Sequence, residues 1–220
     1  MSRVRVHNLA VSLDGYAAGP DQSVEHPLGV GGTWLHEWVF ATRTGAQMLG
    51  RDDGEGGVDD RFLAEGDAGI GATVMGRNMF GPVRGPWGEE QWTGWWGDDP
   101  PYHHPVFVLT HHPRDPVPMR GGTTFYFVCD GIGSALDQAR EAAGGQDVRV
   151  GGGVDTIRQY LRAGLVDDVH LAIVPVLLGR GERLLDGLPD APRDYVCTEV
   201  VTSPAVTHVR LTRARGTGPA

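Results

Sequence analysis

The sequence predicts an α/β protein with a mixed, mostly parallel sheet and an antiparallel hairpin at its C-terminal edge. Short apolar runs recur along the 220 residues and alternate with segments of helical periodicity. These runs are continuous rather than alternating, which is typical of strands covered on both faces. Two β-branched runs near the C-terminus flank Ser203-Pro204, which favours a hairpin turn.

The first expected strand is Arg3–Ser12, which the turn-forming residues Leu13-Asp14-Gly15 end. A long apolar strand is expected over Val169–Leu178, followed by a Gly179-Arg180-Gly181 turn. The other expected strands are short apolar or β-branched runs, at residues 72–75, 105–110, 124–129, 147–150, 195–202 and 206–213.

Two segments have clear helical spacing, Ile132–Ala143 and Asp155–Ala163, and glycines follow both. Residues 34–42 and 59–65 predict shorter helices. The alternation of strands and helices from 124 to 177 predicts the parallel part of the sheet. We therefore expect residues 1–220 to form a single three-layer domain, with insertions at about 50–69 and 81–105.

The composition excludes several functions. A net charge of −9 argues against a nucleic-acid partner. All 19 basic residues are arginine, which excludes a lysine Schiff base and a phosphate loop ending in Gly-Lys-Ser/Thr. No apolar run approaches the length of a membrane span, and the first residues lack the apolar stretch of a secretion signal. We expect a cytoplasmic protein without a membrane partner.

Metal chemistry and hydrolysis also receive little support. Cys129 and Cys197 are isolated, which argues against a disulfide scaffold or a structural zinc site. The histidine pairs 103–104 and 111–112 invite a metal interpretation, but no acidic residue recurs at ligand spacing, so we expect no metal site. The nucleophile, metalloprotease and zinc-deaminase motifs are missing from the sequence.

Three clusters follow expected strands and suit an anionic ligand. They are Gly76-Arg77-Asn78, Leu109–Arg114 with its hydroxyl, two imidazoles and guanidinium, and Gly151-Gly152-Gly153 at a helix start. A glycine-rich turn that leads into a helix presents free backbone N–H groups to phosphate, and arginine binds phosphate through two N–H groups. The alternatives are a structural tight turn and a surface arginine paired with a carboxylate. No acidic residue lies at the spacing of the two-halved dinucleotide-binding fold, so that fold is not supported.

Residues 81–105 contain four tryptophans and no helical or strand period. Such segments in compact domains are lids, binding loops or contact surfaces. We consider a loop anchored by its own tryptophans, a subunit interface and a pocket wall as alternatives.

The order of these motifs resembles the dihydrofolate-reductase-like superfamily, in the branch related to the reductase domain of bacterial riboflavin biosynthesis. The resemblance covers roughly residues 3–186, and residues 195–213 complete the fold. Its motifs are Ser12-Leu13-Asp14-Gly15, Val74-Met75-Gly76-Arg77, Leu109-Thr110, Val150–Gly153, Gly164–Asp168 and Val174–Gly181.

The resemblance implies an NADPH-dependent reductase, usually a homodimer, with a small-molecule substrate. It places Gly76, Arg77 and Asn78 at the adenosine 2′-phosphate side of NADPH, with Thr110 and His111 sharing that phosphate. It places Val11 and Ala17 beside the nicotinamide. The residues that it places at the pyrophosphate are Gly152, Gly153, Val154, Asp155 and Thr156.

One departure bears on the substrate. Riboflavin reductases carry an acidic residue where this chain has Gly151, which puts the ribosylaminopyrimidine in doubt. Glu37 and Asp14 are the candidate catalytic residues, as proton sources beside a bound water, and Glu37 is alternatively a solvated helix residue. We expect hydride transfer to a small heterocyclic or phosphoribosylaminopyrimidine-like substrate, such as 5-amino-6-(5-phosphoribosylamino)uracil. The alternatives are a non-catalytic nucleotide-binding or regulatory protein and a flavin-binding protein.

Overall fold

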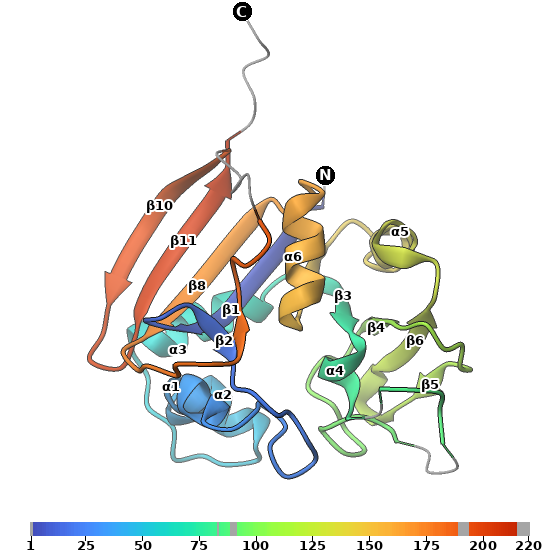
Figure 1. Ribbon diagram of the computed structural model, residues 1–220, viewed down its shortest axis with the longest axis horizontal. Coiled ribbons are helices and arrows are strands. Elements are labelled where there is room, and N and C mark those ends of the chain that lie inside the picture. Colours follow the sequence, from blue (N-terminus) through green and yellow to red (C-terminus); the bar gives the residue numbers. More distant parts are fainter. Residues whose placement is uncertain (1, 83, 89–91, 189–193, 215–220) are drawn as a thin grey trace, which may run out of the picture. The chain divides into compact units, whose positions relative to one another are not determined.

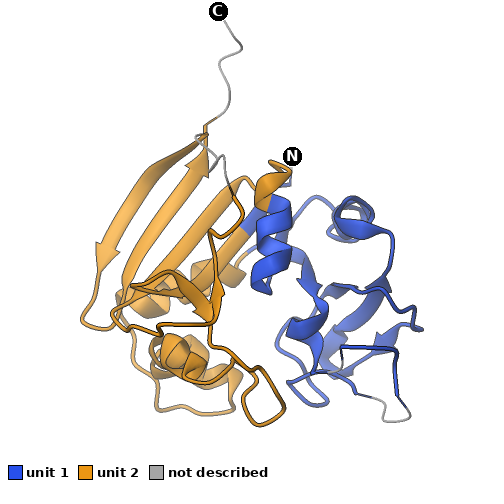
Figure 2. Cartoon of the chain, viewed as in Figure 1, with its two compact units in different colours: residues 1–5, 69–160 blue, residues 6–68, 161–220 orange. Residues whose placement is uncertain are grey.

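The computed structural model describes residues 2–82, 84–88, 92–188 and 194–214 (Figure 1). The chain forms two compact units, unit 1 with residues 1–5 and 69–160 and unit 2 with residues 6–68 and 161–220 (Figure 2). Strand β1 (Val4–Ser12) begins in unit 1 and continues in unit 2. Among the described residues, hydrogen bonds order the main sheet β10-β11-β8-β1-β7-β3-β4-β6-β5, which is the predicted α/β fold.

The strands of unit 1 form the parallel part of the sheet. Every residue of β3 (Ile70–Gly76) is buried, which explains its continuous apolar sequence. Strand β3 pairs in parallel with β7 (Asp147–Val150) and β4 (Pro105–Leu109), and β4 pairs with β6 (Thr124–Val128). The short β5 (Val117–Pro118) pairs antiparallel with β6.

Three α-helices and a 3₁₀ turn accompany these strands. Helix α5 (Gly131–Ala142) packs on β3, β4 and β7 through Ala135, Leu136 and Ala139. The short α4 (Arg77–Phe80) follows β3 directly, and α6 (Val154–Arg162) begins in unit 1 after β7. The 3₁₀ turn η2 covers Arg120–Gly122. The apolar core of unit 1 gathers Met75, Phe80, Val106, Val108 and Phe125, with Trp87 and Trp92 packed against it.

Unit 2 contains the antiparallel edge. Strand β8 (Asp168–Val174) pairs antiparallel with β11 (Thr207–Arg213), which pairs antiparallel with β10 (Tyr195–Thr202). The predicted C-terminal hairpin is therefore confirmed. Strands β2 (Tyr16–Ala18) and β9 (Glu182–Arg183) form a separate small sheet that the sequence did not predict.

The helices of unit 2 are short. The predicted segment 34–42 consists of a 3₁₀ turn, η1 (Gly32–His36), and α1 (Glu37–Ala41). Thr42 has extended dihedrals and caps α2 (Arg43–Met48) by accepting a 3.0 Å hydrogen bond from the Gly45 amide. Helix α3 (Val58–Asp67) lies in the predicted insertion 50–69. The core gathers Ala10, Leu35, Trp38, Leu63, Ala172, Val174 and Val206.

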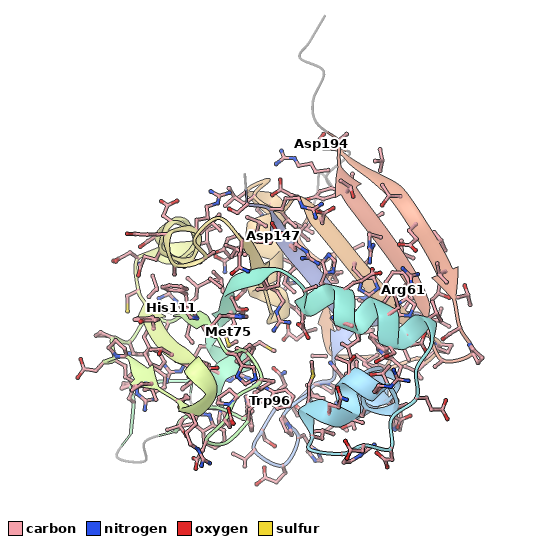
Figure 3. All side chains as sticks on the ribbon, turned by 180° about the vertical axis from the view of Figure 1, so that it is seen from behind. Arg61, Met75, Trp96, His111, Asp147 and Asp194 are labelled. Carbon is pink, nitrogen blue, oxygen red and sulfur yellow. The ribbon has the colours of Figure 1, made fainter. Side chains whose placement is uncertain are left out.

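Polar interactions hold α3 on this unit. Its Arg61, labelled in Figure 3, contacts Glu199 of β10 at 3.1 Å, and Glu65 contacts Arg210 of β11 at 2.7 Å. The ring of Phe62 stacks on His208 and His170, with centroid separations of 4.1 and 4.9 Å. This packing explains why the insertion is an ordered helix.

The predicted strand 169–178 is too long, since β8 ends at Val174. Pro175 has no backbone N–H to continue the ladder. The residues beyond it bind the first turn of unit 2 instead: the Val176 carbonyl accepts from Leu13, and Leu177 is exposed.

The described helices include none that is long and apolar enough to cross a membrane. The described histidine, cysteine and acidic residues form no group of three that could hold a metal ion.

Candidate functional site

The ends of β3 and β7 in unit 1 are joined by two backbone hydrogen bonds. The Gly151 amide donates to the Val74 carbonyl at 2.8 Å, and the Gly76 amide donates to the Gly152 carbonyl at 2.6 Å. Carboxyl ends of neighbouring parallel strands meet at one edge of a sheet, where α/β proteins bind ligands. The structure therefore brings together the Gly-Arg motif and the triple-glycine turn.

Glycine at position 76 is required by packing. A Cβ there would collide with the hydroxyl oxygen of Thr156 and lie 3.4 Å from the Gly153 nitrogen. Both neighbours belong to the turn and first helical turn of α6. The missing side chain lets the end of β3 approach the start of this helix.

The start of α6 offers free backbone donors. The Gly153 carbonyl accepts the Ile157 amide at 3.1 Å, and the preceding amides of the first turn have no partner within the helix. A Cβ added at Gly153 would meet no atom within 4 Å. The N-terminus of a helix favours anions through these N–H groups and the helix dipole.

Arg77 is held in a defined position by two acceptors. One guanidinium nitrogen donates to the Thr110 hydroxyl at 2.8 Å and the other to the Gly85 carbonyl at 3.2 Å. Its Nε atom is buried and has no hydrogen-bond partner among the described residues. Burial, and then the charge of Arg114, lower the pKa of Arg77 to about 10. The cation is therefore less well solvated than a surface arginine and suited to an anion.

The other predicted phosphate residues of this unit have distinct surroundings. Thr110 is buried and bonded to Arg77, whereas His111, labelled with Met75 in Figure 3, is exposed. Asn78 is half-buried, and its backbone carbonyl accepts the indole N–H of Trp95 at 3.3 Å. Val154 and Thr156 are buried, and Asp155 is exposed. Their roles toward a cofactor stay predictions.

Asp14 in unit 2 orders a turn. Its carboxylate accepts the Ser12 hydroxyl at 2.6 Å, the Gly179 amide at 2.7 Å and the Leu178 amide at 3.1 Å. Hydrogen bonds to the carboxylate lower the pKa of Asp14 to about 2. The bond from the Ser12 hydroxyl has the largest effect, ahead of those from the two amides. The group is ionised at neutral pH and already accepts three hydrogen bonds, which suits a positioning residue.

The remaining predicted residues of unit 2 lie near this turn in sequence. Val11 and Ala17 are buried on either side of it. Glu37 is the exposed first residue of α1. Of the two nearby tryptophans, Trp34 is 52% exposed and Trp38 is buried in the core.

Sequence reasoning did not assign roles to Ser12 or Trp87, and it named Arg114 only as one of the residues past an expected strand that could hold an anion. The spacing of Ser12 and Asp14 is a signal for a local side-chain turn. The tryptophan-rich composition of 81–105 marked the segment that contains Trp87. Arg114 belongs to the cluster that follows the expected strand 105–110, but its stacking on Trp87 has no signal in the local sequence.

Solved structures with a similar fold include the following three proteins. A chain from Shewanella sp. PV-4 described as a riboflavin biosynthesis protein has TM-score 0.59 and 23% identity, covering 98% of this chain and 100% of that one. The diaminohydroxyphosphoribosylaminopyrimidine deaminase/5-amino-6-(5-phosphoribosylamino)uracil reductase of Thermotoga maritima has TM-score 0.57 and 14% identity, with 97% of this chain covered. This chain spans only 57% of that protein's length.

Dihydrofolate reductase from Enterococcus faecalis, complexed with NADP(H), has TM-score 0.52 and 12% identity, and 96% of each chain is covered. At these identities the likeness shows the fold, which is dihydrofolate-reductase-like. No curated protein sequence matches this chain. The family model of the RibD C-terminal domain matches residues 5–209. This match covers nearly the whole sequence, so the chain belongs to the RibD C-terminal domain family.

Proposed function

We propose that this protein is an NADPH-dependent oxidoreductase that reduces a small heterocyclic substrate of the riboflavin-pathway type. Membership of the RibD C-terminal domain family supports an oxidoreductase of this type. The observation that carries the proposal is the convergence of Gly76, Arg77, Thr110 and the first turn of α6 at one strand edge of unit 1.

This arrangement fits a phosphorylated dinucleotide. The open space beyond Gly153 and the free amides of the α6 first turn suit a pyrophosphate. The Arg77 guanidinium, with its unpartnered Nε, suits the 2′-phosphate, which carries a charge near −2 at neutral pH. Thr110 orients Arg77 through the 2.8 Å hydrogen bond, so less conformational freedom is lost when an anion binds.

When bound, NADPH would supply the hydride. In the proposal Val11 and Ala17 line the nicotinamide side, and Asp14 fixes the turn between them by binding the Leu178 and Gly179 amides. Glu37 is the proposed proton source, because it is exposed on α1 and has no side-chain hydrogen bond or ion pair among the described residues. A donor of this kind must reach the substrate directly or through one water.

Gly151 constrains the substrate. A Cβ at this position would lie 3.2 Å from the Thr73 methyl group and 3.9 Å from the Arg149 Nε. The acidic side chain that riboflavin reductases carry here is missing, so the proposed substrate need not present the same donors as a ribosylaminopyrimidine. We propose a small planar heterocycle, with 5-amino-6-(5-phosphoribosylamino)uracil as the first compound to test.

Two measurements on the purified full chain test the proposal. Calorimetric titration with NADPH tests the cofactor, and steady loss of NADPH absorbance with pyrimidine, dihydrofolate and simple carbonyl substrates tests turnover. Tight binding with turnover of at least one heterocycle supports the proposal. Failure to bind NADPH contradicts it.

A non-catalytic nucleotide-binding protein is the second candidate. The occupied carboxylate of Asp14 favours it, since one of the two candidate proton sources is committed to backbone amides. NADPH binding without turnover of any substrate supports this candidate.

The homodimer that the resemblance implies is part of the main proposal, and the exposed Val196 and Val200 of β10 offer apolar surface for it. Sedimentation at several concentrations tests it. The cytoplasmic location stays a prediction.

A further inference from the structure

Trp87, from the tryptophan-rich segment, contacts two arginine side chains of unit 1. The guanidinium carbon of Arg77 lies 3.1 Å from the Trp87 ring centre, and that of Arg114 lies 4.7 Å from it. We call Arg77, Trp87 and Arg114 the arginine–tryptophan cluster. Arginine stacks well on tryptophan because the ring face carries partial negative charge.

The ring of Trp87 is itself fixed on the unit. Its indole N–H donates to the His112 carbonyl at 3.0 Å. Its ring makes edge contacts with Phe80 and Phe127, at centroid separations of 5.9 and 5.0 Å. Trp87 therefore connects the residues just past β4 with the core beneath them.

Arg114 is similarly held. One guanidinium nitrogen donates to the Trp92 carbonyl at 2.7 Å, and the guanidinium carbon lies 5.2 Å from the Phe127 ring centre. Neutral carbonyls, a hydroxyl and aromatic faces thus surround both arginines. In the described part of the chain, neither arginine forms an ion pair with a carboxylate.

Two partly buried cations that share one aromatic ring repel each other. Burial lowers the pKa of Arg114, and burial together with the Arg114 charge lowers that of Arg77. A cation–π contact compensates only part of this cost, whereas a phosphate dianion would interact favourably with both guanidinium groups. The cluster is therefore electrostatically complementary to a doubly charged anion.

We propose that Arg114 is a second phosphate-binding residue beside Arg77, and that Trp87 is the positioning residue that holds both guanidinium groups. Arg114 and Trp87 then contribute to the preference for NADPH over NADH. This inference rests on the proposed function and assigns residues within it. His111, the neighbour of Thr110, is exposed, and its share in the phosphate stays a separate prediction.

Trp92 anchors the same segment to unit 1 without stacking on any described arginine. Its indole N–H donates to the Phe80 carbonyl at 2.8 Å, and its ring packs on Trp95 with centroids 4.8 Å apart. None of the described arginines stacks on its ring, so it provides a comparison for Trp87 within the same segment.

Calorimetric titration with NADP⁺ and NAD⁺ tests the role of Arg114 without relying on turnover. Arg114→Gln should weaken NADP⁺ binding by roughly tenfold or more, as for the loss of a charge-assisted hydrogen bond, with little change for NAD⁺. Arg120→Gln is the matched control, because it removes an exposed arginine of the same unit and should leave both affinities unchanged. Thermal unfolding of each variant checks that the fold is retained.

Different results would contradict the proposed function and the role of Arg114. If the wild type binds neither NADP⁺ nor NAD⁺, the proposed function is wrong and this inference falls with it. If the wild type prefers NADP⁺ and Arg114→Gln keeps the full preference, or loses both ligands equally, only this inference is wrong.

The positioning role of Trp87 has its own test. Trp87→Leu should reduce the ratio of NADP⁺ to NAD⁺ affinity, Trp92→Leu should leave that ratio unchanged, and Trp87→Phe should restore most of it by keeping an aromatic face. If Trp87→Leu does not fold, the ratio of NADP⁺ to NAD⁺ affinity in Trp87→Phe and Arg114→Lys tests the positioning role instead. Arg114→Lys keeps the charge but loses the planar stack, so an affinity ratio between those of the wild type and Arg114→Gln supports the proposal. An unchanged ratio in all variants overturns it.

Discussion

The Nε2 atom of His170 lies 3.0 Å from the Nδ1 atom of His208, and both rings are fully buried in unit 2. The Asn8 backbone N–H donates to His170 Nδ1 at 3.1 Å, and His208 Nε2 lies 2.9 Å from the Asp59 carboxylate. Because a carboxylate can only accept, the His208 Nε2–H donates to Asp59, and the Nδ1 of a neutral His208 accepts the His170 Nε2–H. In this assignment His170 Nδ1 accepts the Asn8 backbone N–H and forms no hydrogen bond with Asn8 Oδ1, which lies 3.1 Å from it.

This chain predicts loss of stability in mild acid. Burial, followed by the charges of His208 and Arg210, lowers the pKa of His170 to about 3, from 6.5 in an unfolded chain. Between these values the unfolded state binds more protons than the folded state, so the free energy of unfolding decreases as the pH falls from about 6.5 toward about 3. Burial lowers the pKa of His208 and His104 as well, which acts in the same direction.

Urea unfolding at several pH values measures this dependence. The slope of stability against pH should persist in His103→Gln, since His103 is exposed. It should decrease in His170→Phe, provided that this variant folds at neutral pH. A wild-type unfolding free energy that stays constant across the window would contradict the lowered pKa values of the buried histidines.

Arg77→Ala is expected to raise the KM for NADPH much more than that for NADH. One charge-assisted contact to phosphate contributes about 1.5–3 kcal/mol to binding. NADH has no 2′-phosphate, so its binding does not include this contact and the substitution should affect it little. Steady-state kinetics with both cofactors gives the two ratios. Equal effects on both cofactors would show that Arg77 acts through the structure of the loop, by losing its bonds to Thr110 and Gly85.

Gly153→Val should abolish cofactor binding while the protein remains folded. The added side chain meets no protein atom within 4 Å at its Cβ, so the fold should tolerate it, and we expect it to fill space that the pyrophosphate needs at the α6 first turn. Gly133→Ala on α5 is the matched control, because its Cβ also meets nothing within 4 Å. Thermal unfolding and NADP⁺ titration separate the two effects. Normal NADP⁺ binding by Gly153→Val would mean that the turn is only structural.

Glu37→Gln and Asp14→Asn should have different effects on turnover. Loss of a general acid typically costs about 10²–10⁴-fold in rate, so Glu37→Gln should lower kcat by this order and remove one limb of the pH profile. Asp14→Asn should lower thermal stability, since the carboxylate accepts two backbone amides, and leave the shape of the pH profile intact. If the pH profile changes with Asp14 rather than Glu37, the two roles are reversed.

Much of the parallel sheet could be predicted from sequence because its signals are local. The buried run of β3 and the glycines at positions 76 and 151–153 identify strand ends without tertiary information. The Gly-Arg motif and the triple glycine are also brought together, as parallel strand ends require.

The remainder depends on partners distant in sequence. The carboxylate of Asp14 binds amides more than 160 residues away, so its engagement is invisible in the turn sequence. Strand β8 ends at Val174 because the next residues form hydrogen bonds with the turn at residues 12–14. The Val176 carbonyl accepts the Leu13 amide, and the Leu178 amide donates to Asp14. The pairing of Trp87 with Arg77 and Arg114 joins the first residue of α4 to two loops, which have no periodicity in the sequence.

The hydrogen bond from the Gly179 amide to Asp14 also constrains the order of folding. It joins residues 165 positions apart, and closing so long a loop costs entropy that only later contacts recover. During synthesis the turn after β1 leaves the ribosome long before its partner exists. The turn at residues 12–14 therefore completes its contacts only after residue 179 has been made, and a nascent chain shorter than about 180 residues would lack them, whatever the state of unit 1.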